Sequence, residues 1–184
     1  MNGNTKKLTS MAMLCAIAYV LAVVIHISII PSAPFLTYDP KDVIIAIGGF
    51  IFGPLSALIM SIVVSLLEIF TIGDTGIIGL IMDILSTCSF ACIASLIYKK
   101  RHTFSGAVIG LISGSIAMTI VMLIWNYLIT PSYMGVPREE VVKMLVPVFM
   151  VFNLVKAALN SGFIFVLYKP IITALRKIGF VEKL

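Results

Sequence analysis

The sequence predicts an all-α membrane protein with six transmembrane helices, organised as a single domain over residues 1–184. Sixty per cent of the residues are apolar and only 11% are charged, which is typical of a chain surrounded by lipid and not of a soluble domain. The apolar residues also form six runs separated by polar residues, glycine or proline. These runs cover residues 8–30, 42–53, 55–72, 77–98, 105–130 and 146–168.

The first two runs differ in length. The first follows Lys6 and Lys7 and is longer than the hydrophobic core of a secretory signal peptide, so we expect it to be retained as a transmembrane helix. The second run, as a helix, spans only about 18 Å, against about 30 Å of hydrocarbon in a bilayer. We therefore expect protein to cover it, and the Gly53-Pro54 pair to make a tight turn on the inner side.

The third to sixth runs contain polar residues, most of them toward the outer half of the membrane. On three of these helices the polar residues repeat at helical spacing and form stripes: Ser61, Ser65 and Glu68; Asp83, Ser86 and Thr87; Asn153, Lys156 and Asn160. Asn126 lies at a similar depth in the fifth run. Because polar groups are costly in lipid, stripes on separate helices are expected to face one another. Lys156 lies near the middle of its run and is the first candidate for a functional residue.

The inner half of the fifth run has a different character. Gly106, Gly110 and Gly114 recur every fourth residue, a pattern that lets two helices approach closely. A continuous channel would need polar lining through both leaflets, and a symmetric transporter would have two related halves. Neither pattern is present, so the sequence favours a cup that opens outward and binds a small molecule.

The segment between the first two runs, residues 31–42, is predicted to cover this cup as a lid. Pro31, Pro34 and Pro40 restrict its backbone. Three of its side chains are large and would expose apolar surface to water if the loop were uncovered, namely Phe35, Leu36 and Tyr38. Thr37 lies among them and can present its hydroxyl group to a ligand.

The distribution of charge predicts the orientation of the chain. Nine of its thirteen basic residues fall on one side of a six-helix arrangement: Lys6, Lys7, Lys99, Lys100, Arg101, Lys169, Arg176, Lys177 and Lys183. Basic residues gather on the cytoplasmic side of membrane proteins, so both termini are expected to be cytoplasmic. The net charge of +5 is explained by this orientation and does not indicate binding of nucleic acid.

Several classes of chemistry have no support in the sequence. The chain lacks a P-loop, a dinucleotide-binding glycine motif, a nucleophile elbow and an HExxH helix. Its cysteines, Cys15, Cys88 and Cys92, lie within apolar runs and are expected to pack as small apolar residues without a metal. We therefore expect a protein that is not an enzyme, has no cofactor and depends on other subunits for energy.

Five segments, taken in order, resemble one family of transport proteins. They are MAMLCAIAYVLA, PFLTYDPKDV, GFIFGPL, WNYL and PVFMVFNLVKAALN. Together they resemble the substrate-binding (S) component of energy-coupling factor (ECF) vitamin transporters, specifically the riboflavin type. The most specific parts are the L-T-x-D of the loop and the F-N-x-x-K of the last helix.

The resemblance implies a fold, a ligand and partners. Such S components are six-helix proteins of the bacterial plasma membrane that bind a vitamin in an outward-facing pocket under the first loop. They bind to a transmembrane coupling subunit and two cytoplasmic ATPase subunits, and are thought to topple in the membrane to release the vitamin. By motif, Thr37, Asn126, Asn153 and Lys156 match positions that contact the flavin, and Asp83 flanks them.

The family also carries an AxxxA motif on the first helix for docking on the coupling subunit. Here it is formed by Ala12 and Ala16. Two small side chains one turn apart leave a groove that admits another helix. Their place near the predicted cytoplasmic end of the first run fits that role.

The chemistry of these residues suits riboflavin without requiring it. Asparagine amides offer both a donor and an acceptor to the edge of a flavin, and Leu36 and Tyr38, with Phe35 and Trp125, can form apolar walls. The carboxylate of folate or biotin would instead be attracted to Lys156. Thiamine is cationic and would need Glu68 or Asp83 to dominate the site.

Two structural alternatives and two functional ones stay open. Lys156 can be neutralised by Glu68 or Asp83 in an ion pair, and the asparagines can serve as hydrogen bonds between helices. A proton-coupled carrier that works alone would use Glu68, Asp83 and Lys156 as a relay. An intramembrane enzyme would use Asp83 with His26, but no motif supports this pair.

Overall fold

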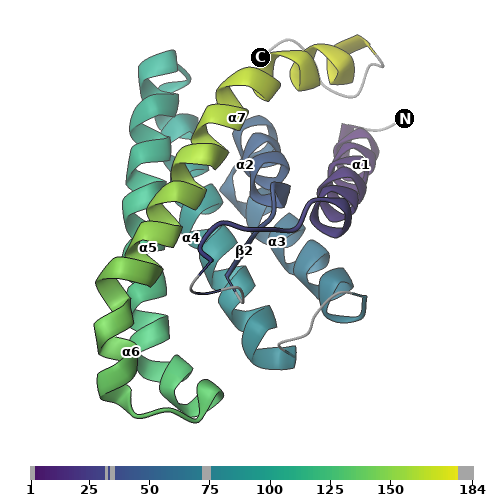
Figure 1. Cartoon of the computed structure of the whole chain (residues 1–184). Coiled ribbons are helices and arrows are strands. Elements are labelled where there is room, and N and C mark those ends of the chain that lie inside the picture. The colour runs from purple at the N-terminus through teal and green to yellow at the C-terminus, as the bar shows by residue number, and fades with distance from the viewer. Residues whose placement is uncertain (1–2, 32, 34–35, 72–75, 178–184) are drawn as a thin grey trace.

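The computed structural model describes residues 3–31, 33, 36–71 and 76–177. Most of the chain is helical, and the all-α class is confirmed (Figure 1). The helices are α1 (Gly3–Val24), α2 (Lys41–Phe52), α3 (Pro54–Ile69), α4 (Gly76–Arg101), α5 (Phe104–Met134), α6 (Arg138–Met144) and α7 (Val151–Lys177). A π-helical segment, η1 (Leu145–Met150), joins α6 to α7. Two short strands, β1 (Ile27–Ser28) and β2 (Thr37–Tyr38), belong to the loop between α1 and α2.

The helices match the six predicted runs, and the largest differences are at both ends of the first run and both ends of the last, where α1 begins at Gly3 and α7 ends at Lys177. Among the described residues, four stretches are long and apolar enough to cross a membrane: Asn4–Val24, Gly76–Arg101, Phe104–Met134 and Arg138–Ala174. Helix α3 is a shorter apolar helix of 16 residues, and α2 has 12. The first helix ends at Val24 and not at residue 30, because Ile27 and Ser28 pair with Tyr38 and Thr37 in an antiparallel ladder.

The last membrane helix begins earlier than predicted, at Arg138. It runs through α6 and the π-helical turn before it continues as α7. Pro147 lies in that turn and has no N–H to donate, which accounts for the local departure from α-helical hydrogen bonding. The turn lies at the outer end of the molecule, close to the loop that carries β2.

Helix α2 is enclosed by protein, as its short length predicted. Every residue from Lys41 to Ile51 is buried, and α2 contacts α1, α3, α4 and α7. A β-carbon added at Gly49 would overlap the Ser95 hydroxyl oxygen and would lie 2.9 Å from the β-carbon of Ala57, so only glycine fits there. Gly53 adopts a φ of 94° and turns the chain directly into Pro54 at the start of α3, which confirms the predicted tight turn.

The glycines of α5 pack against α4, as predicted. A β-carbon on Gly110 would lie 2.6 Å from the backbone oxygen of Ala94, and one on Gly114 would lie 2.5 Å from that of Phe90. Backbone atoms cannot move aside as a flexible side chain can, so these two helices are in direct backbone contact. The pair forms one wall of the molecule.

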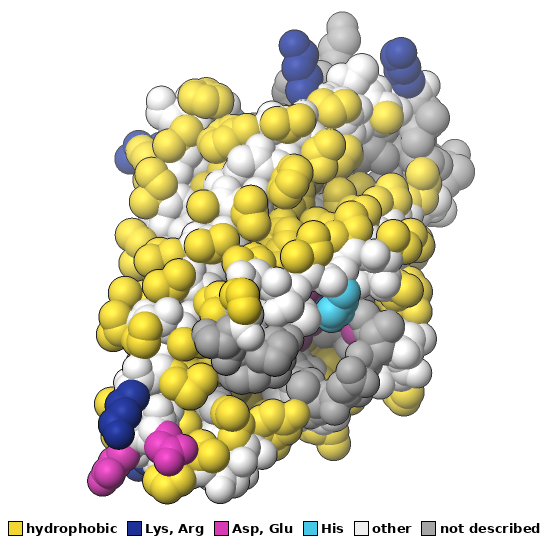
Figure 2. Space-filling view, viewed as in Figure 1, with side chains coloured by type: hydrophobic (Ala, Val, Ile, Leu, Met, Phe, Trp, Pro, Cys, Tyr) yellow, Lys and Arg dark blue, Asp and Glu magenta, His cyan; other side chains and the backbone are white. Residues whose placement is uncertain are grey.

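The two ends of the molecule differ in charge. Helix α1 begins and α7 ends at the same end, where α4 also finishes with Lys99, Lys100 and Arg101 (Figure 1). In the view of Figure 2, lysine and arginine side chains lie at this end without acidic ones, whereas at the opposite end acidic side chains lie beside basic ones. Glu139 and Glu140 of α6 lie at that opposite end. The basic end is the cytoplasmic one by the rule that predicted the orientation.

Candidate functional site

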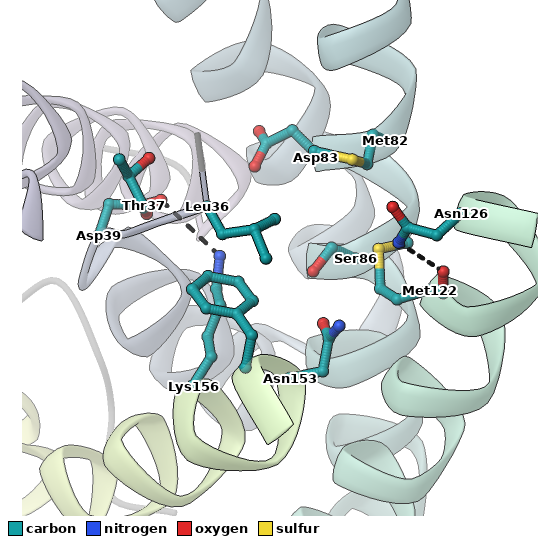
Figure 3. Close-up of a pocket in the computed structure, with 11 residues that line it drawn as sticks. Leu36, Thr37, Asp39, Met82, Asp83, Ser86, Met122, Asn126, Asn153 and Lys156 are labelled. Carbon is teal, nitrogen blue, oxygen red and sulfur yellow. Dashed lines mark hydrogen bonds and ion pairs between the residues drawn. The ribbon is translucent and has the colours of Figure 1, made fainter. Parts of the chain in front are cut away.

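A pocket opens beneath the loop in the outer half of the molecule, where α4, α5 and α7 meet β2. Its volume is about 80 Å³. The residues around it are Leu36, Thr37, Asp39, Met82, Asp83, Ser86, Met122, Asn126, Phe152, Asn153 and Lys156. Four separate parts of the chain therefore contribute side chains to one small space (Figure 3).

Six of the eight residues predicted to bind a ligand line this pocket: Leu36, Thr37, Asp83, Asn126, Asn153 and Lys156. Tyr38 and Glu68 lie beside it, each bonded to a group that supports it, as described below. The predicted lid residue Phe35 lies outside the described residues. Trp125 packs against the main hydrophobic core and does not belong to the described wall of the pocket.

The two asparagines reach the pocket from different helices, α5 and α7 (Figure 3). Asn126 donates a hydrogen bond to the backbone oxygen of Met122 at 2.7 Å and accepts one from the Thr130 hydroxyl at 2.9 Å. Asn153 donates to the backbone oxygen of Phe149 at 2.8 Å. Each amide is thus held by its own helix, and each still carries a second N–H that can bind a ligand.

The loop closes the pocket with apolar contacts as well as strand pairing. Leu36 and Ala33 belong to a small hydrophobic cluster with Val141, Phe149 and Phe152. This cluster joins the loop to α6, η1 and the start of α7. The contacts of Leu36 and Ala33 in this cluster therefore fix the position of the loop above the pocket.

Lys156 forms ion pairs with partners that the sequence did not suggest. Its ammonium group lies 3.1 Å from the Asp42 carboxylate and 3.7 Å from that of Asp39. Glu68 and Asp83, which were left open as possible partners of Lys156, are instead bonded to a second buried lysine. Lys41 donates to Glu68 in a short contact and to Asp83 at 2.7 Å.

Asp42 is the centre of the network around Lys156. It has no exposed surface, and it accepts hydrogen bonds from the Thr87 hydroxyl at 2.6 Å and from the Asn160 amide at 3.4 Å. Asn160 in turn accepts a hydrogen bond from the Tyr38 hydroxyl at 3.1 Å. This chain of contacts links β2 of the loop to α2, α4 and α7.

Asp39 and Tyr38, in the loop, hold opposite protonation states at neutral pH. Burial would raise the pKa of Asp39, but the nearby charges of Lys156 and Lys41, with His26, hold it below its ordinary value, so the carboxylate is ionised. Burial, reinforced by the charge of Asp42, raises the pKa of Tyr38 to about 12, so its hydroxyl remains a donor. Within the described residues, one Asp39 oxygen is buried and has no hydrogen-bond partner.

Sequence reasoning missed Lys41, Asp39 and Asp42 as parts of the site. They stand together in the segment Asp39-Pro40-Lys41-Asp42, which reads as a polar loop ahead of an apolar run. The structure buries all three because α2 begins inside the protein, beneath the loop. The sequence did contain a signal for this burial. The second apolar run is too short to cross the membrane and is therefore covered by protein, so the charged residues at its start are covered as well.

A family model described as the substrate-specific component of ECF transporters matches residues 6–171. The chain belongs to this family. The riboflavin transporter RibU of Staphylococcus aureus is 32% identical over 183 residues, which cover 95% of each chain. RibU of Streptococcus thermophilus is 28% identical over 95% of this chain and 87% of its own, and FmnP of Bacillus subtilis, also named a riboflavin transporter, is 31% identical over 71% and 70%.

A solved structure supports the same assignment. It is described as the S component of a bacterial ECF transporter and superposes with a TM-score of 0.78 at 31% identity, covering 94% of this chain and 98% of the other. The protein is therefore an S component that crosses the bacterial plasma membrane several times. Its apolar helices and the predicted family resemblance are both confirmed.

The predicted docking motif of this S component lies on the outside of the molecule. Ala12 and Ala16 are exposed on α1, whereas Met11, Leu14 and Cys15 on the same helix are buried. The two alanines are one turn apart near the middle of α1. A partner helix can therefore reach them without displacing any part of the described chain.

Proposed function

We propose that this S component binds riboflavin in the pocket beneath the loop and delivers it for uptake across the plasma membrane. The observation that carries the proposal is the pair of oriented amides, Asn126 and Asn153, which meet from two helices at an otherwise mainly apolar pocket. Such a pair suits the alternating donors and acceptors on the edge of a flavin. Three similar proteins that carry the name of riboflavin transporters support the same ligand.

The charge around Lys156 favours a neutral ligand. Two carboxylates already neutralise its ammonium group, and two more face Lys41, so the cluster has an excess of acids over lysines. The carboxylate of folate or biotin would meet this excess negative charge close to Lys156. Riboflavin is uncharged and avoids the cost. Thiamine is the alternative that the excess of acids favours, since it is a cation.

The loop must move for any of these vitamins to enter. A volume of about 80 Å³ is smaller than the roughly 300 Å³ at the lower end of small-molecule sites. Leu36 and Phe152 project into this space from the loop and from α7, and their shared hydrophobic cluster is small. We infer that the loop lifts with Leu36 to admit the ligand.

Fluorescence titration tests the ligand directly. The purified protein should quench riboflavin fluorescence on binding and should bind thiamine or biotin much more weakly. Asn126→Ala and Asn153→Ala should each weaken riboflavin binding by about tenfold or more, as expected when a buried hydrogen bond of about 1–3 kcal/mol is lost. Ser115→Ala on α5 is the matched control, because its hydroxyl bonds to Leu111 of its own helix, away from the pocket.

The outcome against the proposal is equally clear. If riboflavin binds only at micromolar concentrations or weaker, while thiamine binds more tightly, the site belongs to a cationic vitamin. If Ser115→Ala weakens riboflavin binding as much as Asn126→Ala does, the amides have no specific part in recognition.

We further propose that uptake requires a transmembrane coupling subunit and two cytoplasmic ATPases. The chain carries no nucleotide-binding motif of its own, and its exposed Ala12 and Ala16 offer a surface for a partner helix. The alternative of a proton relay through Glu68, Asp83 and Lys156 loses support, because Lys156 pairs with a different set of acids.

Replacement of both alanines by leucine separates these mechanisms. The variant should bind riboflavin as the wild type does but should not support energised uptake, because leucine fills the groove. Leucine at Met13, which is exposed on the same helix, is the control. If the wild-type chain transports riboflavin without partners, and an uncoupler abolishes that uptake, the coupled mechanism is wrong.

A further inference from the structure

A second cavity lies at the cytoplasmic end of the molecule, far from the loop. It has a volume of about 260 Å³ and is larger than the outer pocket. Four helices contribute to it, because Phe50 lies near the end of α2, Tyr98 near the end of α4, Ala107 near the start of α5, and Phe165 in α7. The proposed binding of riboflavin at the opposite end makes no use of this cavity.

The walls of the inner cavity are aromatic and open on one side. Phe50 and Ile164 are buried and form its deep part. Phe104 and Phe165 are exposed, with their ring centres 5.5 Å apart. Two large aromatic rings at the rim of a cavity, in the membrane-facing part of a helix bundle, present an apolar entrance from the lipid.

The remaining edge of the cavity is basic. His102 and Lys169 line it, and Lys99, Lys100 and Arg101 directly precede His102 in the last turn of α4. The described part of the chain has ion pairs only at Lys41 and Lys156, in the outer half, so none of these cytoplasmic basic groups is paired there with a carboxylate. His102 also adopts a φ of 44°, which is unusual for a residue other than glycine and fixes its position in the turn.

We propose that this cavity binds an anionic phospholipid of the cytoplasmic leaflet. The phosphate would lie against Lys169 and His102, and the first part of an acyl chain would enter between Phe104 and Phe165. The occupant must be anionic at one end and apolar at the other, and it must reach the site from the membrane. Basic pockets between transmembrane helices on the cytoplasmic side commonly bind acidic lipid headgroups.

The proposal is tested with two lipids that differ in charge. Native mass spectrometry of the purified full-length chain would count bound phosphatidylglycerol and phosphatidylcholine at equal concentrations. Phosphatidylglycerol should be retained preferentially. Lys169→Gln should reduce its binding about fivefold, as expected for one basic residue near a lipid headgroup.

Two further variants separate a defined site from general attraction. Arg138→Gln removes the same charge at the outer end, where its guanidinium lies over the Tyr127 ring, and should leave phosphatidylglycerol binding unchanged. Ala107→Phe keeps every charge but fills the cavity, and should reduce binding as much as Lys169→Gln does. Gel filtration of each variant confirms that it is folded.

Four results would overturn the proposal. Equal retention of both lipids would mean that charge is not recognised. Equal losses in Lys169→Gln and Arg138→Gln would indicate unspecific attraction. Unchanged binding in Ala107→Phe would place the lipid on the surface. If Lys169→Gln instead lowers only the yield of a complex with the coupling subunit, the cavity is a protein contact.

Discussion

Replacing Lys41 by methionine tests whether the second buried lysine holds the outer end of the helix bundle together. The side chain is only 2% exposed, and its ammonium group bonds to Glu68 of α3 and Asp83 of α4. Methionine is of similar length and fills the same space. The variant therefore removes the charge while keeping the packing, and leaves two carboxylates facing each other.

The size of the effect follows from this geometry. Removing one partner of a buried ion pair costs about 3–5 kcal/mol, because the other partner remains charged and unpaired. For a chain of this length, 1 kcal/mol corresponds to about 2–4 °C in melting temperature. Lys41→Met should therefore lower the melting temperature by about 10 °C. Lys143→Met, which changes an exposed lysine on α6, should alter it by about 1–2 °C at most.

A compensating variant shows whether charge is the cause. The triple variant Lys41→Met, Glu68→Gln, Asp83→Asn removes the charges of both carboxylates together with that of the lysine, and should recover most of the lost stability, since neutral replacements of buried ion pairs are often tolerated. The assay is thermal unfolding in detergent without ligand. The reasoning is refuted if Lys41→Met melts within about 2 °C of Lys143→Met, or if the triple variant is no more stable than Lys41→Met.

Three other outcomes are expected. Gly114→Leu should destabilise the protein by more than about 2 kcal/mol, because its β-carbon would meet the backbone of Phe90. In the control Gly162→Ala, the added β-carbon meets nothing within 4 Å, so this variant should be neutral or slightly stabilising. Equal melting temperatures of the two variants would contradict the close packing of α4 and α5. Tyr38→Phe should cost about 1 kcal/mol and raise the rate of riboflavin dissociation, because the loop loses its bond to Asn160; stopped-flow fluorescence measures this rate, and an unchanged rate would mean that this bond does not hold the loop. The pKa of Asp39 is lowered in the folded protein, so its contribution to stability is complete above its ordinary pKa of 3.8 and is lost only as the pH falls through the lower folded value. The difference in stability between wild type and Asp39→Asn should therefore be the same at pH 8 and at about pH 5. A difference that shrinks between these two pH values would contradict the lowered pKa.

The sequence predicted the parts of the fold that depend on spacing and the parts of the site that depend on depth. The recurrence of Gly106, Gly110 and Gly114 was sufficient to predict a close helix contact, and the position of Lys156 was sufficient to place it in a buried polar site. The partners of Lys156 could not be predicted in this way. Glu68 and Asp83 lie at a suitable depth on neighbouring helices, and only the three-dimensional position of α2 shows that Lys41 reaches them first.

The predicted end of the first helix was wrong for a similar reason. Four of residues 25–30 are isoleucine, so the first run continues by composition, and only the alternation of isoleucine with His26 and Ser28 marks the change from helix to strand after Val24. The chain leaves the helix there because Ile27 and Ser28 find partners in β2, ten residues or so along the chain. Strand pairing therefore ends the helix where the loop must cross the pocket, although the apolar composition continues to residue 30.

Most transmembrane helices both match the thickness of the bilayer and hold functional side chains in place. The enclosure of α2 separates these two tasks. The helices that face lipid determine where the molecule sits in the bilayer, and they must match its thickness. Helix α2 need not match the bilayer thickness, since α1, α3, α4 and α7 surround it. It can therefore be as short as the ion pairs of Lys41 and Asp42 require. In a thicker or thinner membrane, the helices that face lipid should change their tilt, while the ion pairs of Lys41 and Asp42 keep their geometry.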